Sequence, residues 1–310
     1  MTTIVERQHY VWRRYLAAWC VGDTVWCSRF KEGKFFASNP INLAVERYFY
    51  ELTDLTDDDI KFIQSFVNRA TIPGLKELNT RWVEQYNLLF NLVRLARTLH
   101  ADKADVQAQI TTLLTQIEEQ ALAHVEGEST VFLDALIAGD VSFFDNPDQA
   151  SKFLIFLMQQ YFRTKKIRDG TLNVSLPGVL NVDLERAWPV FRHVFATNVG
   201  AGLFARRATM KPCVVEAPDG MEFITGDQPI INTYAGQDPK AMVQRDEYFY
   251  PVSPRRALLL SENVDTHALH GSQVSALRAH VLNDMMANAA HEQRFASRRE
   301  SLETHQPKAP

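Results

Sequence analysis

Residues 206–225 read RRATMKPCVVEAPDGMEFIT, and this stretch decides between an all-helical fold and an α+β fold. Before Arg207, apolar residues recur at helical spacing, whereas Pro212 to Val215 and Met221 to Thr225 are apolar runs of strand length. Between these runs, Pro218-Asp219-Gly220 is typical of a tight turn. The stretch therefore predicts a strand, a turn and a second strand after a long helical region.

Further strands are predicted on both sides of this stretch. From Val21 to Phe36, β-branched and aromatic residues surround two turn sequences, which indicates a small antiparallel hairpin, and Val45 to Leu52 is a further extended segment. Downstream, Tyr248 to Pro251 and Ala257 to Leu260 are expected to be extended, and Ser275 to Ala290 returns to helical spacing. The sheet is thus expected to draw strands from both ends of the chain.

The middle of the chain is predicted to be helical. Thr56 followed by three aspartates is typical of a helix start, because a hydroxyl caps free amides and carboxylates favour the positive end of the helix dipole. The predicted fold class is α+β, a helical bundle packed on a small, mainly antiparallel sheet. We expect a single domain, 1–310, with a β-rich part (1–55), a helical part (56–206), C-terminal strands and a helix (207–300) and a flexible tail (301–310).

Composition excludes several classes of protein. An apolar fraction of 46% and a net charge of −4 over 310 residues match a globular chain rather than a disordered one. The three cysteines are an odd number and no secretory leader is recognised, so we expect a cytoplasmic protein with reduced thiols. The longest apolar runs are far shorter than the roughly 20 residues of a membrane helix, which argues against a membrane partner.

The common catalytic fingerprints are absent from the sequence: there is no phosphate-binding Gly-rich loop with its lysine, no dinucleotide-binding glycine triplet and no His-Glu-x-x-His pair. Four local clusters remain as candidates. The first contains His9 and Tyr10 ahead of Arg14, where His9 can act as a general acid or base near neutral pH. Alternatively, a neutral His9 is simply hydrogen-bonded beneath the hairpin.

The second cluster places Glu46 within an apolar, aromatic segment, where a buried carboxylate must be paired or functional. It is equally compatible with a strand that turns Glu46 to water. In the third, Arg163 at a helix end can clamp a phosphate or carboxylate, although basic residues at a helix C-terminus also suit its dipole. Its companions are Gln160, Lys165, Lys166 and Arg168. In the fourth, Asp227 ends an apolar strand, either as a metal-binding or acid–base group or as a turn former.

Taken together, these clusters resemble a bacterial family of unknown function marked by an N-terminal His-Tyr-Val-Pro motif. The resemblance spans nearly the whole chain and rests on several short motifs in order. They are His9-Tyr10-Val11, Val45-Glu46-Arg47-x-Phe49-Tyr50, Gln160-x-x-Arg163-Thr164, Ile224 to Pro229, Pro251-x-Ser253-Pro254 and Asn283. Trp12 replaces the motif's proline, and Thr225-Gly226-Asp227-Gln228-Pro229 replaces Thr-Ser-Asp-Asn-Pro. The resemblance implies a bacterial or phage origin and supplies no activity.

If the polar motif residues converge, they form a pocket suited to hydrolysis or transfer at an anionic group. We therefore expect a hydrolase acting on a phosphodiester, plausibly a nuclease-like toxin or antiviral defence effector, with His9, Glu46, Arg163 and Asp227 as catalytic residues. The substrate-binding residues would be Tyr10, Arg14, Gln160, Lys165, Lys166 and Arg168, and the partner would be nucleic acid or a nucleotide. The sequence leaves open whether a divalent metal serves as cofactor. The alternatives are a binding module with a buried polar network and an enzyme of small anionic molecules.

Overall fold

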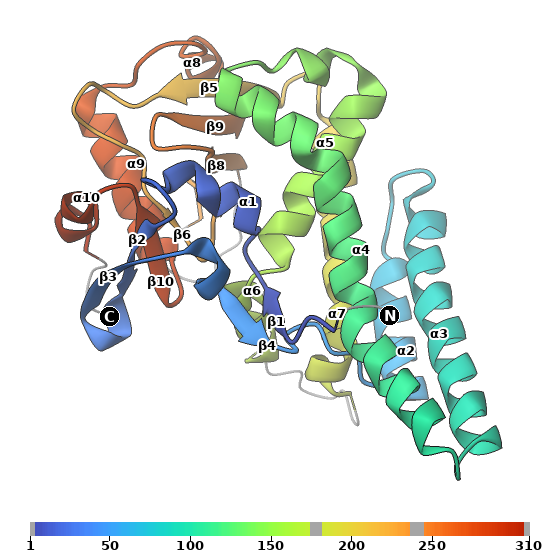
Figure 1. Ribbon diagram of the computed structural model, residues 1–310. Helices are drawn as coiled ribbons and strands as arrows, with labels where there is room; N and C mark the ends of the chain where they lie inside the picture. Colours follow the sequence, from blue (N-terminus) through green and yellow to red (C-terminus); the bar gives the residue numbers. More distant parts are fainter. Residues whose placement is uncertain (1–3, 174–181, 236–244, 307–310) are drawn as a thin grey trace.

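The computed structural model describes residues 4–173, 182–235 and 245–306 and has the α+β architecture (Figure 1). Long helices form one side of the molecule, and two four-stranded antiparallel sheets with short helices form the other. A third, two-stranded sheet lies beside the helical side, where the beginning of the chain passes between the two halves. The predicted fold class is therefore confirmed.

The N-terminal part contains the predicted hairpin, formed by β2 (Val25–Arg29) and β3 (Lys34–Ser38). Before it come β1 (Arg7–His9), α1 (Arg13–Leu16) and a 3-10 helix (Ala17–Trp19). The extended segment expected from Val45 to Leu52 is only partly present, because β4 ends at Arg47. Tyr48 has φ +52°, a left-handed conformation that cannot continue a strand. β4 pairs antiparallel with β1.

The helical side contains six helices among the described residues: α2 (Asp57–Val67), α3 (Leu75–Leu99), α4 (Ala104–Ala138), α5 (Pro147–Phe162), α6 (Lys165–Leu172) and α7 (Leu184–Ala205). The predicted helix start is confirmed: the Thr56 hydroxyl accepts from the amide of Asp59, whose carboxylate accepts from the amide of Thr56. None of these described helices is long and apolar enough to cross a membrane.

The strand–turn–strand hairpin predicted for residues 212–225 is wrong. β5 (Lys211–Glu216) exists, but it pairs with β9 (Arg256–Ser261), in a sheet completed by β8 (Glu247–Pro251) and β7 (Ile231–Asn232). Residues 221–224 form no strand because other groups take their backbone hydrogen bonds. Asn283 bonds both the amide of Ile224 and the carbonyl of Glu222, and the Trp19 indole donates to the carbonyl of Phe223.

The other four-stranded sheet joins the two ends of the chain. β10 (Gln293–Ala296) lies between β2 and the short strand β6 (Thr225–Gly226), so the order is β3-β2-β10-β6. The helices of this part are α8 (Val264–His267), α9 (Ala276–Ala289) and α10 (Arg299–Thr304). This sheet therefore pairs the N-terminal hairpin with strands from the C-terminal part of the chain.

The flexible tail expected from Ser301 is ordered as far as Gln306, and residues 307–310 lie outside the described part. Leu302 is fully buried against the C-terminal core, and Arg294 donates a hydrogen bond to the carbonyl of His305. Sequence composition gives no sign of this docking, because it depends on a buried arginine from a different strand.

The three cysteines are free thiols. Cys27 and Cys213 are buried, and burial raises the pKa of Cys27 to about 12 and that of Cys213 to about 11. These thiols are therefore protonated at neutral pH and serve as packing groups.

Candidate functional site

The candidate residues form two separate groups on either side of the segment that contains His9 and Tyr10. In the β1–β4 pair, Gln8 faces Glu46 and His9 faces Val45. Because neighbouring side chains along a strand point to opposite faces, His9 and Glu46 lie on opposite sides of this ribbon. The four residues proposed as catalytic do not converge at one point.

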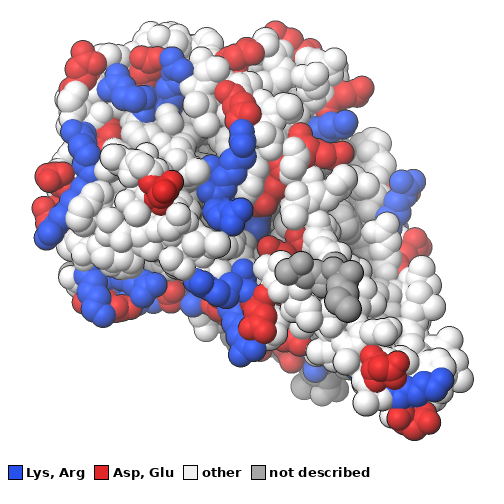
Figure 2. Space-filling view, in the orientation of Figure 1, with Lys and Arg blue, Asp and Glu red and all other residues white. Residues whose placement is uncertain are grey.

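The first group lines a cleft of about 1000 Å³. One wall consists of the N-terminal segment and α1, and the other contains Glu119 and Glu126 of α4, with Arg163 at the inner end. Figure 2 shows Lys and Arg side chains over α1, with Asp and Glu side chains in the hollow beside them, toward α4. His9 and Arg14 are the other predicted residues on this cleft. We refer to it below as the His9 cleft.

Arg163 is buried and fixes the inner end of the His9 cleft, and its donors are occupied. Its Nε donates to the Tyr50 hydroxyl at 2.8 Å, its Nη2 donates to the His9 carbonyl at 2.5 Å, and its Nη1 pairs with Glu126. Gln160 lies beside it, with its Oε1 at 3.5 Å from Nη1. Arg163 therefore positions the catalytic candidates around it, rather than offering a free guanidinium to a substrate as the sequence suggested.

Glu119 and Glu126 are two carboxyls that sequence reasoning missed. Burial raises the pKa of both side chains, and the neighbouring Arg163 only partly opposes this effect. The Oε2 atom of Glu119 is buried without a hydrogen-bond partner among the described residues. In the sequence, Glu119 and Glu126 are indistinguishable from acidic residues on a solvent-exposed helix face. Their seven-residue spacing nevertheless places both on the same side of α4.

The His9 ring is held in its uncharged form. Burial lowers its pKa most, and the positive charges of Arg13 and Arg163 lower it further, while the carbonyls of Pro40 and Ile41 act in the opposite direction. Its Nε2 atom, like the Oε2 of Glu119, is buried and has no hydrogen-bond partner in the described part of the chain. Unpaired buried polar atoms are rare in native proteins, so their gathering here marks this end of the cleft.

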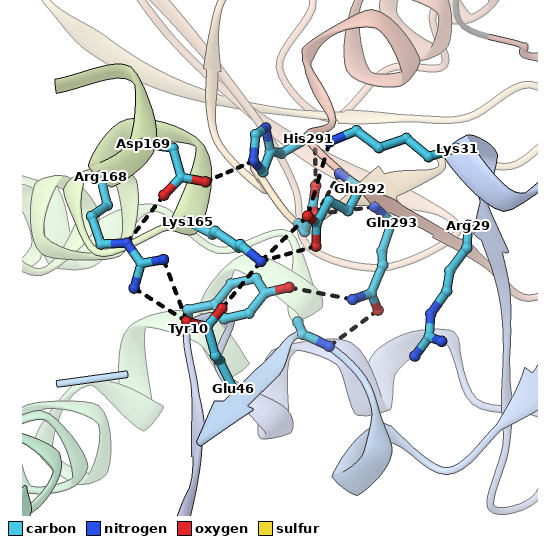
Figure 3. Close-up of polar contacts among 12 residues, drawn as sticks. Tyr10, Arg29, Lys31, Glu46, Lys165, Arg168, Asp169, His291, Glu292 and Gln293 are labelled. Carbon is cyan, nitrogen blue, oxygen red and sulfur yellow. Dashed lines mark hydrogen bonds and ion pairs between the residues drawn. The ribbon is translucent and has the colours of Figure 1, made fainter. Parts of the chain in front are cut away.

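The second group is a network of ion pairs (Figure 3). The Lys165 amine lies between Glu46 at 3.1 Å and Glu292 at 3.3 Å, and Arg168 reaches Glu46 at 3.4 Å. His291 and Asp169, at 3.0 Å, extend the network on the same side. Both oxygens of Glu46 are therefore engaged by cations.

Asp227 and Tyr10 lie beneath this network and are held by hydrogen bonds within the protein. The buried Asp227 carboxylate accepts hydrogen bonds from the backbone amides of His291, Glu292 and Gln293 at 2.7–3.0 Å. Burial raises the pKa of Asp227, and the three amides oppose this rise. The hydroxyl of Tyr10 accepts a hydrogen bond from the side-chain amide of Gln293 at 3.3 Å. Asp227 thus holds the turn before β10 and is not positioned to orient His9.

Lys166 and Arg14 each contact other groups of the protein. The Lys166 amine donates to the carbonyl of Ala289 at 2.5 Å, and burial lowers its pKa. Arg14 bonds both carboxylate oxygens of Asp134 at 2.9 Å, with both side chains half exposed. Arg14 therefore reaches the mouth of the His9 cleft, whereas Lys166 ties α6 to the end of α9.

A buried polar network continues from the cleft into the helical side. Arg163 and Arg192 lie against the Tyr50 ring, with guanidinium carbons 5.5 Å and 5.0 Å from its centre. Beyond Arg192, the Glu118 carboxylate accepts from Arg192 and from the Tyr86 hydroxyl and lies 3.1 Å from His193. No local sequence pattern indicates this network, because its members come from five separate segments.

Comparison with known families gives one match over most of the chain. The family described as "Protein of unknown function (DUF4238)" matches residues 7–187 and 183–300. Neither the curated proteins nor the solved structures contain a significant match.

Proposed function

The chain belongs to the DUF4238 family of unknown function, and we propose that it is a hydrolase that cleaves phosphodiesters by acid–base catalysis in the His9 cleft. One observation carries the proposal: the cleft joins a histidine whose pKa is lowered to two carboxyls whose pKa values are raised. Burial favours the uncharged form of each group, which is the form that a histidine acting as general base and a carboxyl acting as general acid must have.

In the proposed reaction, uncharged His9 accepts a proton from water as the water oxygen attacks phosphorus. Protonated Glu119, whose Oε2 atom has no hydrogen-bond partner among the described residues, gives a proton to the leaving oxygen as its bond to phosphorus breaks. One P–O bond forms and one breaks, and the two protons move through different groups. Because His9 Nε2 lies in the wall of the cleft, a small turn of the ring toward the cleft is required for it to meet the water.

Arg13 supports an anionic substrate. Arg13 is exposed on the wall of the His9 cleft and forms no ion pair with a described residue, and its positive charge lowers the pKa of His9. A phosphate at this position would balance that charge. Arg163 contributes by position, because it fixes the His9 backbone and the Glu126 carboxylate in one rigid unit. We extend the proposal to nucleic acid as substrate and to a role as a toxin or defence effector.

The test is cleavage of RNA and of single- and double-stranded DNA by the purified full chain, with and without Mg²⁺ or Mn²⁺. His9→Gln and Glu119→Gln should each lower the cleavage rate by roughly 100-fold or more, as loss of a general acid or base does. The matched control is His124→Gln on the exposed face of α4, which should cleave at the wild-type rate. Growth arrest on expression, relieved by His9→Gln, would support the effector role.

Two results would contradict the proposal. The first is that neither RNA nor DNA is cleaved under any of these conditions. The second is cleavage that His9→Gln and Glu119→Gln leave unchanged while circular dichroism shows intact folds, because the activity would then come from another site or a contaminant.

A second candidate function is a binding module without chemistry, and one observation favours it. The donors of Arg163 are occupied by protein groups, as they are in structural networks. This reading predicts that a nucleic acid binds with a strong dependence on salt but is not cut. The same cleavage assay, combined with a binding assay at two salt concentrations, separates the two functions.

A further inference from the structure

Three residues of the C-terminal helices bring metal-ligating atoms together, and we propose that they bind a divalent transition-metal ion such as Zn²⁺. His280 and Asp284 lie one turn apart on α9, and His305 follows α10. Each residue offers one ligand atom, and these atoms all lie within 4.8 Å of one another. This cluster is independent of the His9 cleft and lies away from α4 (Figure 1).

The ligand atoms lie near the separations that a metal site needs, and the hydrogen bond between His305 and Asp284 must open to admit an ion. The Nε2 of His280 lies 3.4 Å from Asp284 Oδ2, and the Nδ1 of His305 lies 2.7 Å from Asp284 Oδ1. Ligands about 2.1 Å from a tetrahedral zinc ion are about 3.4 Å apart. An ion can therefore be held with small side-chain adjustments, without movement of either helix.

The third ligand is already fixed in position. The His305 side chain is 4% exposed, and the backbone carbonyl of this residue accepts a hydrogen bond from the buried Arg294. The Asn283 amide lies 3.4 Å from His305 Nε2, and it is itself fixed by the backbone of Glu222 and Ile224. A ligand held by such outer contacts loses little freedom when a metal binds.

The other two ligands face solvent. The side chains of His280 and Asp284 are 46% and 40% exposed, so an ion can enter and keep a water molecule in the remaining position. Two imidazoles with one carboxylate suit zinc and neighbouring transition metals rather than magnesium, which prefers oxygen ligands. An ion bound here would connect α9 to the end of α10.

The chain contains a matched control on α4. His124 and Glu128 form the same i,i+4 pair, with His124 Nε2 at 3.6 Å from Glu128 Oε1 and both side chains exposed. The described residues provide no third metal ligand at this pair. It therefore reports what an exposed histidine–carboxylate pair binds without the contribution of His305.

The experiment is calorimetric titration of the untagged full chain with ZnCl₂ at neutral pH. We expect one ion per chain, and His280→Ala and Asp284→Asn should each raise the Kd at least tenfold, whereas His124→Ala should leave it unchanged. MgCl₂ should not bind to the three residues. Because His280 and Asp284 are exposed, their replacement preserves the fold, which circular dichroism verifies.

Three outcomes would overturn the proposal. The first is no saturable Zn²⁺ binding by the wild-type chain. The second is equal binding by the wild-type, His280→Ala and Asp284→Asn chains, which would place the ion elsewhere. The third is an equal loss in His124→Ala, because the pair on α4 would then be as good a site as the proposed one.

Discussion

Replacing Arg163 by methionine tests whether Arg163 holds the His9 cleft together. The change keeps most of the side-chain volume and removes the charge. The side chains of Arg163 and Glu126 are 2% and 14% exposed, so the carboxylate would lose its partner in a largely buried place. Breaking a buried ion pair from one side costs about 3–5 kcal/mol of the free energy of unfolding, and we expect a loss in that range.

Most of this cost comes from Glu126 rather than from the other partners of Arg163. The Tyr50 hydroxyl keeps its hydrogen bond to the His9 carbonyl at 3.1 Å when Arg163 is lost, so neither group is left unpaired. Adding Glu126→Gln to Arg163→Met should therefore recover part of the loss. We expect a coupling energy of about 2–3 kcal/mol in the double-mutant cycle.

The assay is urea unfolding of the four chains, followed by circular dichroism, at neutral and acidic pH. The Arg163→Met chain should lose less stability at about pH 4, because Glu126 is then protonated in both the folded and the unfolded state. The loss should grow as pH rises above the ordinary carboxyl pKa of 4.5. Purely additive effects, or a loss below about 1 kcal/mol, would refute the role given to this pair.

Two further predictions concern the other buried carboxyls. Asp227→Asn places an NH₂ group against the backbone amides whose hydrogen bonds the carboxylate accepts. The change should cost about 1–3 kcal/mol of unfolding free energy for each amide left unpaired. An unchanged urea midpoint would contradict the role assigned to Asp227. In the wild-type chain, the Glu119 carboxyl has a raised pKa, so its ionisation destabilises the fold as pH rises through and above 4.5. Glu119→Gln removes this effect. The variant should match wild type at low pH and be more stable at neutral pH; thermal unfolding that shows the opposite sign would refute this.

Local chemistry explains which parts of the fold were predictable. The cap at Thr56 and the hairpin from Val25 to Ser38 depend on neighbouring residues, and both occur where the sequence places them. The hairpin predicted for residues 212–225 failed because its partners come from elsewhere: β9 pairs with β5, and Asn283 bonds the backbone around Ile224. Long-range pairing of this kind leaves no local signal in one sequence.

The same limit applies to the candidate site. Sequence motifs identified His9 and Arg163, which meet in the structure, because unusual polar residues within apolar segments stand out. Glu119 and Glu126 were missed because a long, acidic helix gives no sign of which carboxylates are covered by another segment. Asp227 was placed at a strand end, but its three amide partners lie more than 60 residues away.

The titration of His9 tests the central claim most directly. NMR spectra of the imidazoles, with His9→Gln used to assign the signal among the nine histidines, would give the pKa of His9 with and without inorganic phosphate. Our account predicts a pKa below 6.5 that rises when phosphate binds in the cleft, because a nearby anion favours the charged ring. A pKa at or above 6.5 that does not respond to phosphate would contradict the assignment of this cleft as an acid–base site for anionic substrates.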